Sequence, residues 1–178
     1  MPEPLVVAFV PGVTPGKWER VWRERRVGRL SLVPLGQDAA LAALRDGSAH
    51  MVLARDTTAD DAWHAIPLYR ENPVVVAPRG SLVAALDAVD LADLADETVL
   101  PVDLGRPEDA VELVAADVGV AIMPQSVARA VSRKDVVARP LRDAPDTGIS
   151  LVWPQDDAHP LSDVFIGIVR GRTANSSR

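Results

Sequence analysis

A loop rich in glycine and proline is the first part of this sequence whose residues suggest chemistry. Gly12–Lys17 follows an apolar run and precedes a helical pattern, as a phosphate-binding loop does. Its Gly-x-x-x-Gly-Lys-Trp spacing is one residue short, and it lacks the hydroxyl that holds magnesium, so a nucleotide-binding loop is rejected. The Thr14 hydroxyl and the N–H groups of the following helix can still hold a carboxylate, while a plain helix cap at Thr14 is an equally good interpretation.

The same arrangement of strand, loop and helix start recurs twice, at Leu35–Asp38 and at Met123–Ser126. In an open α/β sheet, ligands bind beyond the carboxyl ends of the strands, where such helix starts gather. Three of them in one chain favour a small-molecule site, although every protein with repeated βαβ units contains them.

Residues for catalysis or metal binding do not form a recognisable set. The chain has no cysteine, and His50, His64 and His159 have no partner at a spacing of three or four, so each is interpreted as a surface or packing residue. No Gly-x-Ser-x-Gly motif is present. Adjacent acidic pairs such as Asp156-Asp157 point to different sides of their element and favour a solvated face. We therefore expect no enzyme activity, no metal and no cofactor.

One basic cluster alternates with two tryptophans near the N-terminus. An amphipathic helix whose arginines cover apolar surface is the favoured interpretation over a nucleic-acid site, and a subunit interface is the functional alternative. The residues concerned are Trp18, Arg20, Trp22, Arg23, Arg25, Arg26 and Arg29.

The overall composition limits the classes of partner. A net charge of −6 and a pI near 5.0 argue against nucleic-acid binding by bulk electrostatics. No apolar run reaches the roughly 18 residues of a membrane helix, and Met1–Pro4 does not resemble the start of a secretion signal. We expect a cytoplasmic protein with no membrane contact.

The elements that would position these residues follow a βαβ order in the first third of the chain, which predicts a parallel sheet. Thr14 is expected to cap a helix that begins at Pro15 and carries both indoles on one face. The predicted strands are Leu5–Val10, Leu30–Leu35 and Met51–Ala54, with helices over 15–26 and 39–46.

The remaining chain predicts further strands and helices in alternation. A short helix within Asp87–Glu97 is expected to turn Leu91 and Leu94 inward. The other predicted strands are Val74–Ala77, Val99–Val102, Val120–Met123 and Ile149–Trp153, with helices after Arg106, after Pro124 and from Leu161 to Val169.

These pieces, in this order, resemble the effector-binding domain of LysR-type transcriptional regulators, a member of the type 2 periplasmic-binding-protein fold. Leu41–Gly47 followed by His50–Ala54 is similar to the family's helix, glycine and strand, where Asp often stands at the position of His50. Val114–Pro124 resembles the helix-to-strand signature of the second lobe, with Asp117 where the family usually has glycine. Pro67–Glu71 with Val74–Pro78 resembles the strand that leaves the first lobe, and Leu91–Leu94 resembles the helix after it.

The resemblance implies two α/β lobes joined by crossover strands. The first lobe is expected to span residues 1–77 and 140–178, and the second, smaller lobe residues 78–139. The second lobe is expected to be shortened, because Pro101–Asp109 leaves little room for a strand and a helix. No helix-turn-helix precedes Leu5, so direct DNA binding by this chain is not expected.

By resemblance, a small organic acid or aromatic carboxylate is expected to bind between the lobes, at Thr14, Gln37, Asp38, Arg55, Met123 and Gln125. The family also pairs through its first helix and the neighbouring strand, which implies a homodimer contact at Trp18, Trp22 and Arg25. The expected function is an effector-binding sensor acting in transcriptional regulation or on a separate protein partner. A solute receptor of an uptake system and a protein-interaction module with a vestigial cleft are the alternatives.

Overall fold

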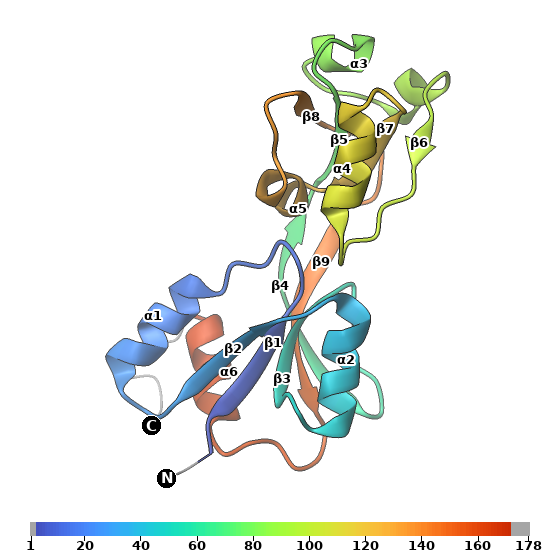
Figure 1. Ribbon diagram of the computed structural model, residues 1–178. Coiled ribbons are helices and arrows are strands. Elements are labelled where there is room, and N and C mark those ends of the chain that lie inside the picture. The colour runs from blue at the N-terminus through green and yellow to red at the C-terminus, as the bar shows by residue number, and fades with distance from the viewer. Residues whose placement is uncertain (1–2, 172–178) are drawn as a thin grey trace. The chain divides into compact units, whose positions relative to one another are not determined.

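The computed structural model describes residues 3–171, which form two compact units (Figure 1). Unit 1 holds the described chain up to Tyr69 and again from Gly148, and unit 2 holds Arg70–Thr147. The divisions therefore lie eight residues away from the lobe boundaries expected from the sequence, because β5, which was assigned to the first lobe, pairs only with strands of unit 2. Within the described residues, no helix is long and apolar enough to cross a membrane.

Unit 1 is built on a mixed five-stranded sheet with the order β2-β1-β3-β9-β4. The strands β1, β2 and β3 are parallel, as the βαβ order predicted, while β9 runs antiparallel to β3. Every residue of β3 is buried, which explains its continuous apolar sequence. The bounds are β1 Leu5–Phe9, β2 Leu30–Pro34, β3 Met51–Arg55, β4 Trp63–Glu71 and β9 Thr147–Pro154.

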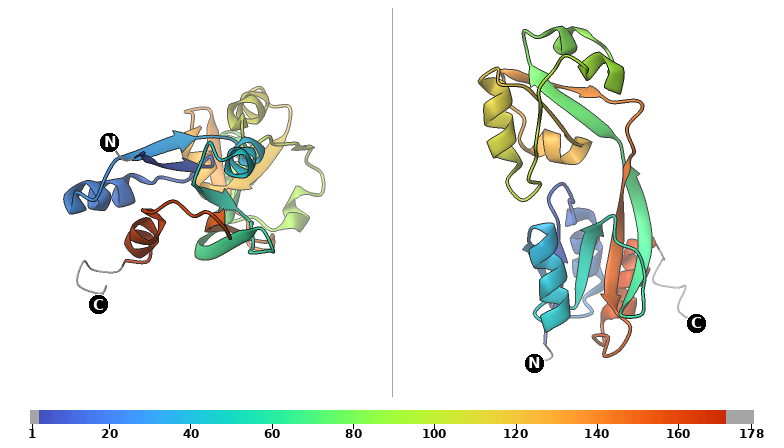
Figure 2. Two further views of the ribbon diagram at one scale, coloured as in Figure 1. Left: turned by 90° about the horizontal axis from the view of Figure 1, so that it is seen from below. Right: turned by 90° about the vertical axis from the view of Figure 1, so that its right-hand side faces the viewer.

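Helices cover both faces of this sheet. α1 (Gly16–Arg25) and α6 (Ser162–Val169) lie side by side on one face, and α2 (Gln37–Asp46) lies on the other (Figure 1 and Figure 2). Trp22 and Phe165 meet between α1 and α6, with ring centroids 6.0 Å apart. Both side chains are almost fully buried, so the pair ties the two helices to one core.

Unit 2 is built on a four-stranded sheet with the order β6-β7-β5-β8. The central strand β5 runs antiparallel to β7 and β8, and β6 runs parallel to β7. The bounds are β5 Pro73–Pro78, β6 Val99–Leu100, β7 Val120–Pro124 and β8 Val136–Pro140, with helices α3 Leu82–Ala85, η1 Leu91–Leu94 (a 3₁₀ helix), α4 Pro107–Ala115 and α5 Gln125–Ala130.

Two cores flank the sheet of unit 2, and β5 serves both. Val74 and Val76 pack on one side with residues of α4 and α5, while Val75 and Ala77 pack on the other with residues of α3 and η1. This alternation follows from the two-residue period of a strand. It makes β5 apolar at every position between its terminal prolines.

Four sequence expectations need correction here. α1 begins at Gly16 with Pro15 as its N-cap, and no side chain caps it, so Thr14 does not. Leu94 is buried as expected, but Leu91 is 46% exposed. The sequence analysis assigned no strand to β8 and no helix to α3.

Asp117 ends α4 with a left-handed backbone, at a φ of 60°. This conformation favours glycine, which explains why glycine is the usual residue at the matching position of the family that the sequence resembles. The departure at Asp117 therefore retains the turn and carries a local conformational cost.

Candidate functional site

Three loops of unit 1 lie at one edge of its sheet because they follow the carboxyl ends of the parallel strands β1, β3 and β2. The loop after β1 contains Pro11 and Gly12, whose positive φ of 89° turns the chain. The loop after β2 ends at Gly36, the N-cap of α2. Arg55 is the last residue of β3. This is the edge at which an α/β sheet binds ligands.

Gln37 and Arg55 are locked together by reciprocal hydrogen bonds. The Arg55 backbone N–H donates to Gln37 Oε1 at 3.0 Å, and Gln37 Nε2 donates to the Arg55 carbonyl at 2.7 Å. Thr57 Oγ1 lies 3.0 Å from the same carbonyl and 3.3 Å from Gln37 Nε2. The Gln37 side chain therefore fixes the end of β3 against the start of α2.

The Arg55 guanidinium extends this bracket to the third loop. Its Nη2 donates to the Pro11 carbonyl at 3.0 Å, and the residue is only 7% exposed. A buried guanidinium carries a large desolvation cost unless its donors are satisfied, so these contacts hold it in a defined position. We call Pro11, Gln37, Arg55 and Thr57 the loop bracket. The sequence analysis missed Pro11 and Thr57, because one acts through its carbonyl and the other has no motif.

Thr14 and Asp38 lie in the same loop region, but they are exposed and take no part in the loop bracket. Asp38 is in the first turn of α2, and the Gly36 N-cap supplies no side chain for the N–H groups of that turn. The positive end of the α2 dipole therefore faces outward at this edge. Uncapped N–H groups next to a fixed guanidinium are the donor set that recognises a carboxylate.

In unit 2, the two residues expected at a ligand site have different surroundings. Met123 is 2% exposed and belongs to the core against α4 and α5, so its side chain is a packing residue in this structure. Gln125 is partly exposed at the start of α5, where its backbone N–H donates to the Asn72 carbonyl at 3.1 Å. Its neighbour Ser126 carries a buried hydroxyl without a hydrogen-bond partner, which the sequence analysis did not single out as a ligand contact.

The tryptophans expected at a dimer contact are buried within unit 1. Trp18 is 6% exposed and Trp22 3%, and Trp22 Nε1 donates to the Gly28 carbonyl at 2.8 Å. Arg25 is partly exposed. Any contact made by α1 with another molecule must therefore use the residues beside the indoles.

The histidines do not stand alone in space. His50 and His159, far apart in sequence, have ring centroids 4.5 Å apart, and His64 lies 5.1 Å from Trp153 by the same measure. Across residues 3–171, no group of three or more histidine or acidic side chains is placed to hold a metal ion. The pairing of His50 with His159 has no counterpart in their sequence spacing.

Comparison with known proteins gives one family and a group of related folds. The family model described as LysR substrate binding domain matches residues 23–107 and 101–174. Among curated proteins, no match is found.

The effector-binding domain of a BenM variant is 18% identical and superposes with a TM-score of 0.79, over 96% of this chain and 97% of that one. The BenM effector-binding domain with its effector benzoate is 19% identical, with a TM-score of 0.78 over 94% and 90% of the two chains. A mutant OxyR regulatory domain from Pseudomonas aeruginosa is 16% identical, with a TM-score of 0.75 over 96% of each chain.

Proposed function

This chain belongs to the LysR substrate-binding domain family and has its type 2 periplasmic-binding-protein-like fold, and from this premise we propose that it is a non-catalytic sensor of small organic acids or aromatic carboxylates. Binding would shift the population of its conformations toward the one that holds the ligand better. The readout would be a change in transcription, in the compartment that holds the DNA, through a domain or partner that contacts DNA. A relative of the same fold, BenM, has benzoate as its effector.

The loop bracket is the observation that carries this proposal. Its hydrogen bonds hold three loops of unit 1 in one arrangement without a ligand, so little ordering remains to be done on binding. Arg55 would attract the carboxylate, and the first N–H groups of α2 would orient it. Thr14 and Asp38 would contact the rest of the ligand as exposed neighbours.

Gln125 and Met123 are proposed to contribute from unit 2. Gln125 offers a partly exposed amide, whereas Met123, being buried, would limit the space available rather than touch the ligand directly. The unsatisfied Ser126 hydroxyl next to Gln125 is a further donor that a ligand oxygen would satisfy.

We also propose a homodimer in which α1 of one copy contacts α4 of another. Exposed arginines of α1, such as Arg20, face solvent, and α4 exposes Glu108, Glu112 and the apolar Leu113, which is 46% exposed. Opposite charges around an apolar contact favour association. Sedimentation should therefore show a dimer that Arg20→Glu weakens and that Glu112→Arg partly restores, with Arg170→Glu as the unaffected control.

Thermal unfolding against a panel of organic acids tests the sensor function. A ligand present at 100 times its dissociation constant should add about 2.7 kcal/mol to the free energy of unfolding. Thr14→Val is the sharpest variant, because this exposed hydroxyl caps no helix and its loss should cost the fold little. Thr98→Val, an exposed threonine in unit 2, is the matched control.

We expect a saturable rise in Tm with at least one carboxylate, weaker in Thr14→Val and in Arg55→Lys but unchanged in Thr98→Val. Lysine keeps the charge of Arg55 but loses the planar pair of donors. If no acid in a broad panel raises the Tm, the sensor proposal is wrong and an interaction module becomes the better interpretation.

A further inference from the structure

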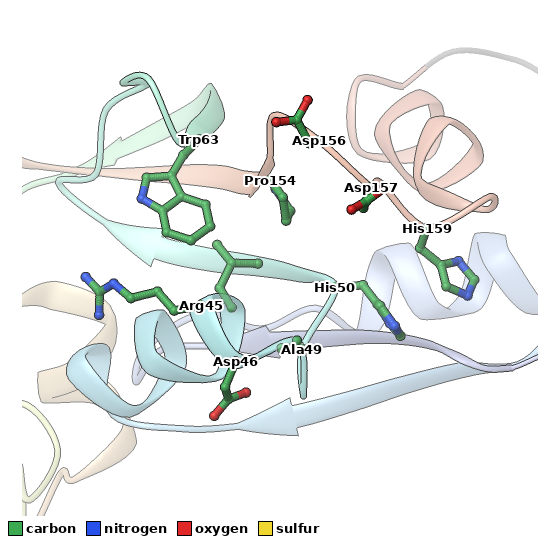
Figure 3. A pocket seen from close by; sticks show the side chains of 11 residues that line it. Arg45, Asp46, Ala49, His50, Trp63, Pro154, Asp156, Asp157 and His159 are labelled. Carbon is green, nitrogen blue, oxygen red and sulfur yellow. The ribbon is translucent and has the colours of Figure 1, made fainter.

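Unit 1 has a cavity of about 350 Å³ at the end of its sheet opposite the loop bracket (Figure 3). It lies where α2 ends, β3 begins and β4 begins, and all of its lining residues belong to unit 1. Small-molecule sites have volumes of roughly 300–1,000 Å³, so this cavity is large enough for a small ligand.

Apolar side chains form one wall of the cavity. Trp63, the first residue of β4, and Pro154, the last residue of β9, lie next to each other in Figure 3, and Leu44 of α2 completes this wall. Trp63 is only partly buried, so part of its indole is available to a ligand. A tryptophan ring is the best aromatic surface for a cation because of its negative face.

The paired histidines at the other end of the cavity are neutral acceptors. His50 Nδ1 accepts from the Val6 N–H at 3.0 Å, and His159 Nδ1 accepts from the Leu161 N–H at 3.2 Å. An imidazole that accepts at Nδ1 carries its proton on Nε2 and is uncharged. Burial, followed by the nearby His159, lowers the pKa of His50, which agrees with this assignment. The histidines therefore bring no positive charge to the cavity.

The remaining charges are mainly negative. Asp46, Asp156 and Asp157 line the cavity, and Arg45 is the one lysine or arginine among the lining residues. Asp46 already accepts from the Ser48 N–H and hydroxyl, whereas Asp156 and Asp157 are exposed at the rim. Figure 3 shows Arg45 extending away from the two histidines. A ligand in this cavity would meet an excess of negative charge beside an aromatic surface.

We propose that this cavity binds a small organic cation, an amine or quaternary ammonium on an apolar body. The cationic group lies over Trp63 within the field of Asp157, and the apolar body packs against Leu44 and Pro154. This site is separate from the carboxylate site proposed above. It differs in the charge of its ligand and in the end of the sheet that it occupies.

Calorimetric titration of the full chain with benzylamine, benzyl alcohol and benzoate tests this inference, because the three probes share a ring and differ in charge. Benzylamine should bind at least about threefold more tightly than benzyl alcohol, the ratio expected for one cation–π contact. Trp63→Leu and Asp157→Asn should each weaken benzylamine binding by about threefold to tenfold. Asparagine suits position 157 because the backbone there is left-handed, with a φ of 54°.

Asp87→Asn removes the same charge from an exposed position in unit 2 and should leave the titration unchanged. NMR signals of the His50 and His159 rings should shift with benzylamine, which places the ligand in this cavity. Equal binding of benzylamine and benzyl alcohol, no benzylamine binding, or equal weakening by Asp87→Asn would each overturn the inference. Benzoate binding that depends on Arg55 and not on Trp63 reports only on the carboxylate site, so the two proposals can fail independently.

Discussion

Gln37 shows at the scale of a single residue how the carboxylate edge is held. Its amide satisfies both the N–H and the carbonyl of Arg55, and the carbonyl has Thr57 as a second partner. Gln37→Leu would leave the N–H of a buried residue without this acceptor. We expect the free energy of unfolding to fall by about 1–3 kcal/mol, measured by urea denaturation.

The exposed Gln155 is the matched control for that substitution. Its Nε2 donates to the Asp60 carbonyl at 3.1 Å at the surface, so Gln155→Leu should change stability by less than about 0.5 kcal/mol. Equal effects of the two substitutions would show that the loop bracket contributes nothing special to the fold.

His50 makes the stability of unit 1 depend on pH. Its pKa lies below the ordinary value of 6.5, because of burial first and of His159 second, while Glu3 opposes the shift. Between the folded and the unfolded pKa, the unfolded chain binds more protons, so the free energy of unfolding falls as the pH falls below about 6.5. Protonation of Nδ1 would also remove the acceptor of the Val6 N–H.

His50→Asn keeps an acceptor near the position of Nδ1 and removes the titrating group. Urea denaturation at several values of pH should therefore show a shallower loss of stability on acidification in this variant than in the natural chain. If both proteins lose stability with the same slope, His50 is not the group responsible.

At the scale of elements, the pairing of β6 with β7 depends on Gly119. A Cβ at this position would lie 2.2 Å from the Thr98 carbonyl oxygen, which accepts the Val120 N–H at 2.9 Å. Gly119→Ala must therefore push the two strands apart. The expected cost is about 1–3 kcal/mol in the free energy of unfolding, measured by urea denaturation with NMR signals of unit 2.

Gly167→Ala is a suitable comparison, because nothing lies within 4 Å of a Cβ there and the residue is inside α6. Alanine should stabilise this helix by about 0.5–1 kcal/mol. A neutral Gly119→Ala would mean that β6 and β7 can separate without cost.

The elements that the sequence predicts well are those buried on both faces. β3 and β5 are continuous apolar runs ended by glycine, proline or charged residues, so their pattern is unambiguous. β8 was missed because it pairs on one side only, with β5, and exposes alternate residues such as Ala138 and Pro140. Its sequence resembles a loop more than a strand.

The candidate site is predictable only in part for similar reasons. Gln37 and Arg55 follow from the rule that parallel strands end at one edge, which the pairing of β1 with β2 and β3 bears out. The partnership of Arg55 with the Pro11 carbonyl depends on packing that no spacing encodes. Met123 was expected at the ligand, but strand alternation directs it into the core.

For the whole molecule, the two units differ in how the chain builds them. Unit 2 is one continuous segment with its own sheet and two cores, whereas unit 1 needs both ends of the chain. A fragment spanning Arg70–Thr147 should therefore fold alone, though with low stability because small domains bury little surface. Circular dichroism should show a cooperative melt, and a fragment of residues 3–69 should show none.

The place of β9 in the sheet of unit 1 also sets an order of events during synthesis on the ribosome. β9 lies between β3 and β4, but it is translated after all of unit 2. β4 therefore waits beside an empty position until the last part of the chain emerges, while unit 2 can already be complete. For that interval, the nascent chain exposes two sheet edges that the finished protein covers, and it is then most open to chaperones and to aggregation.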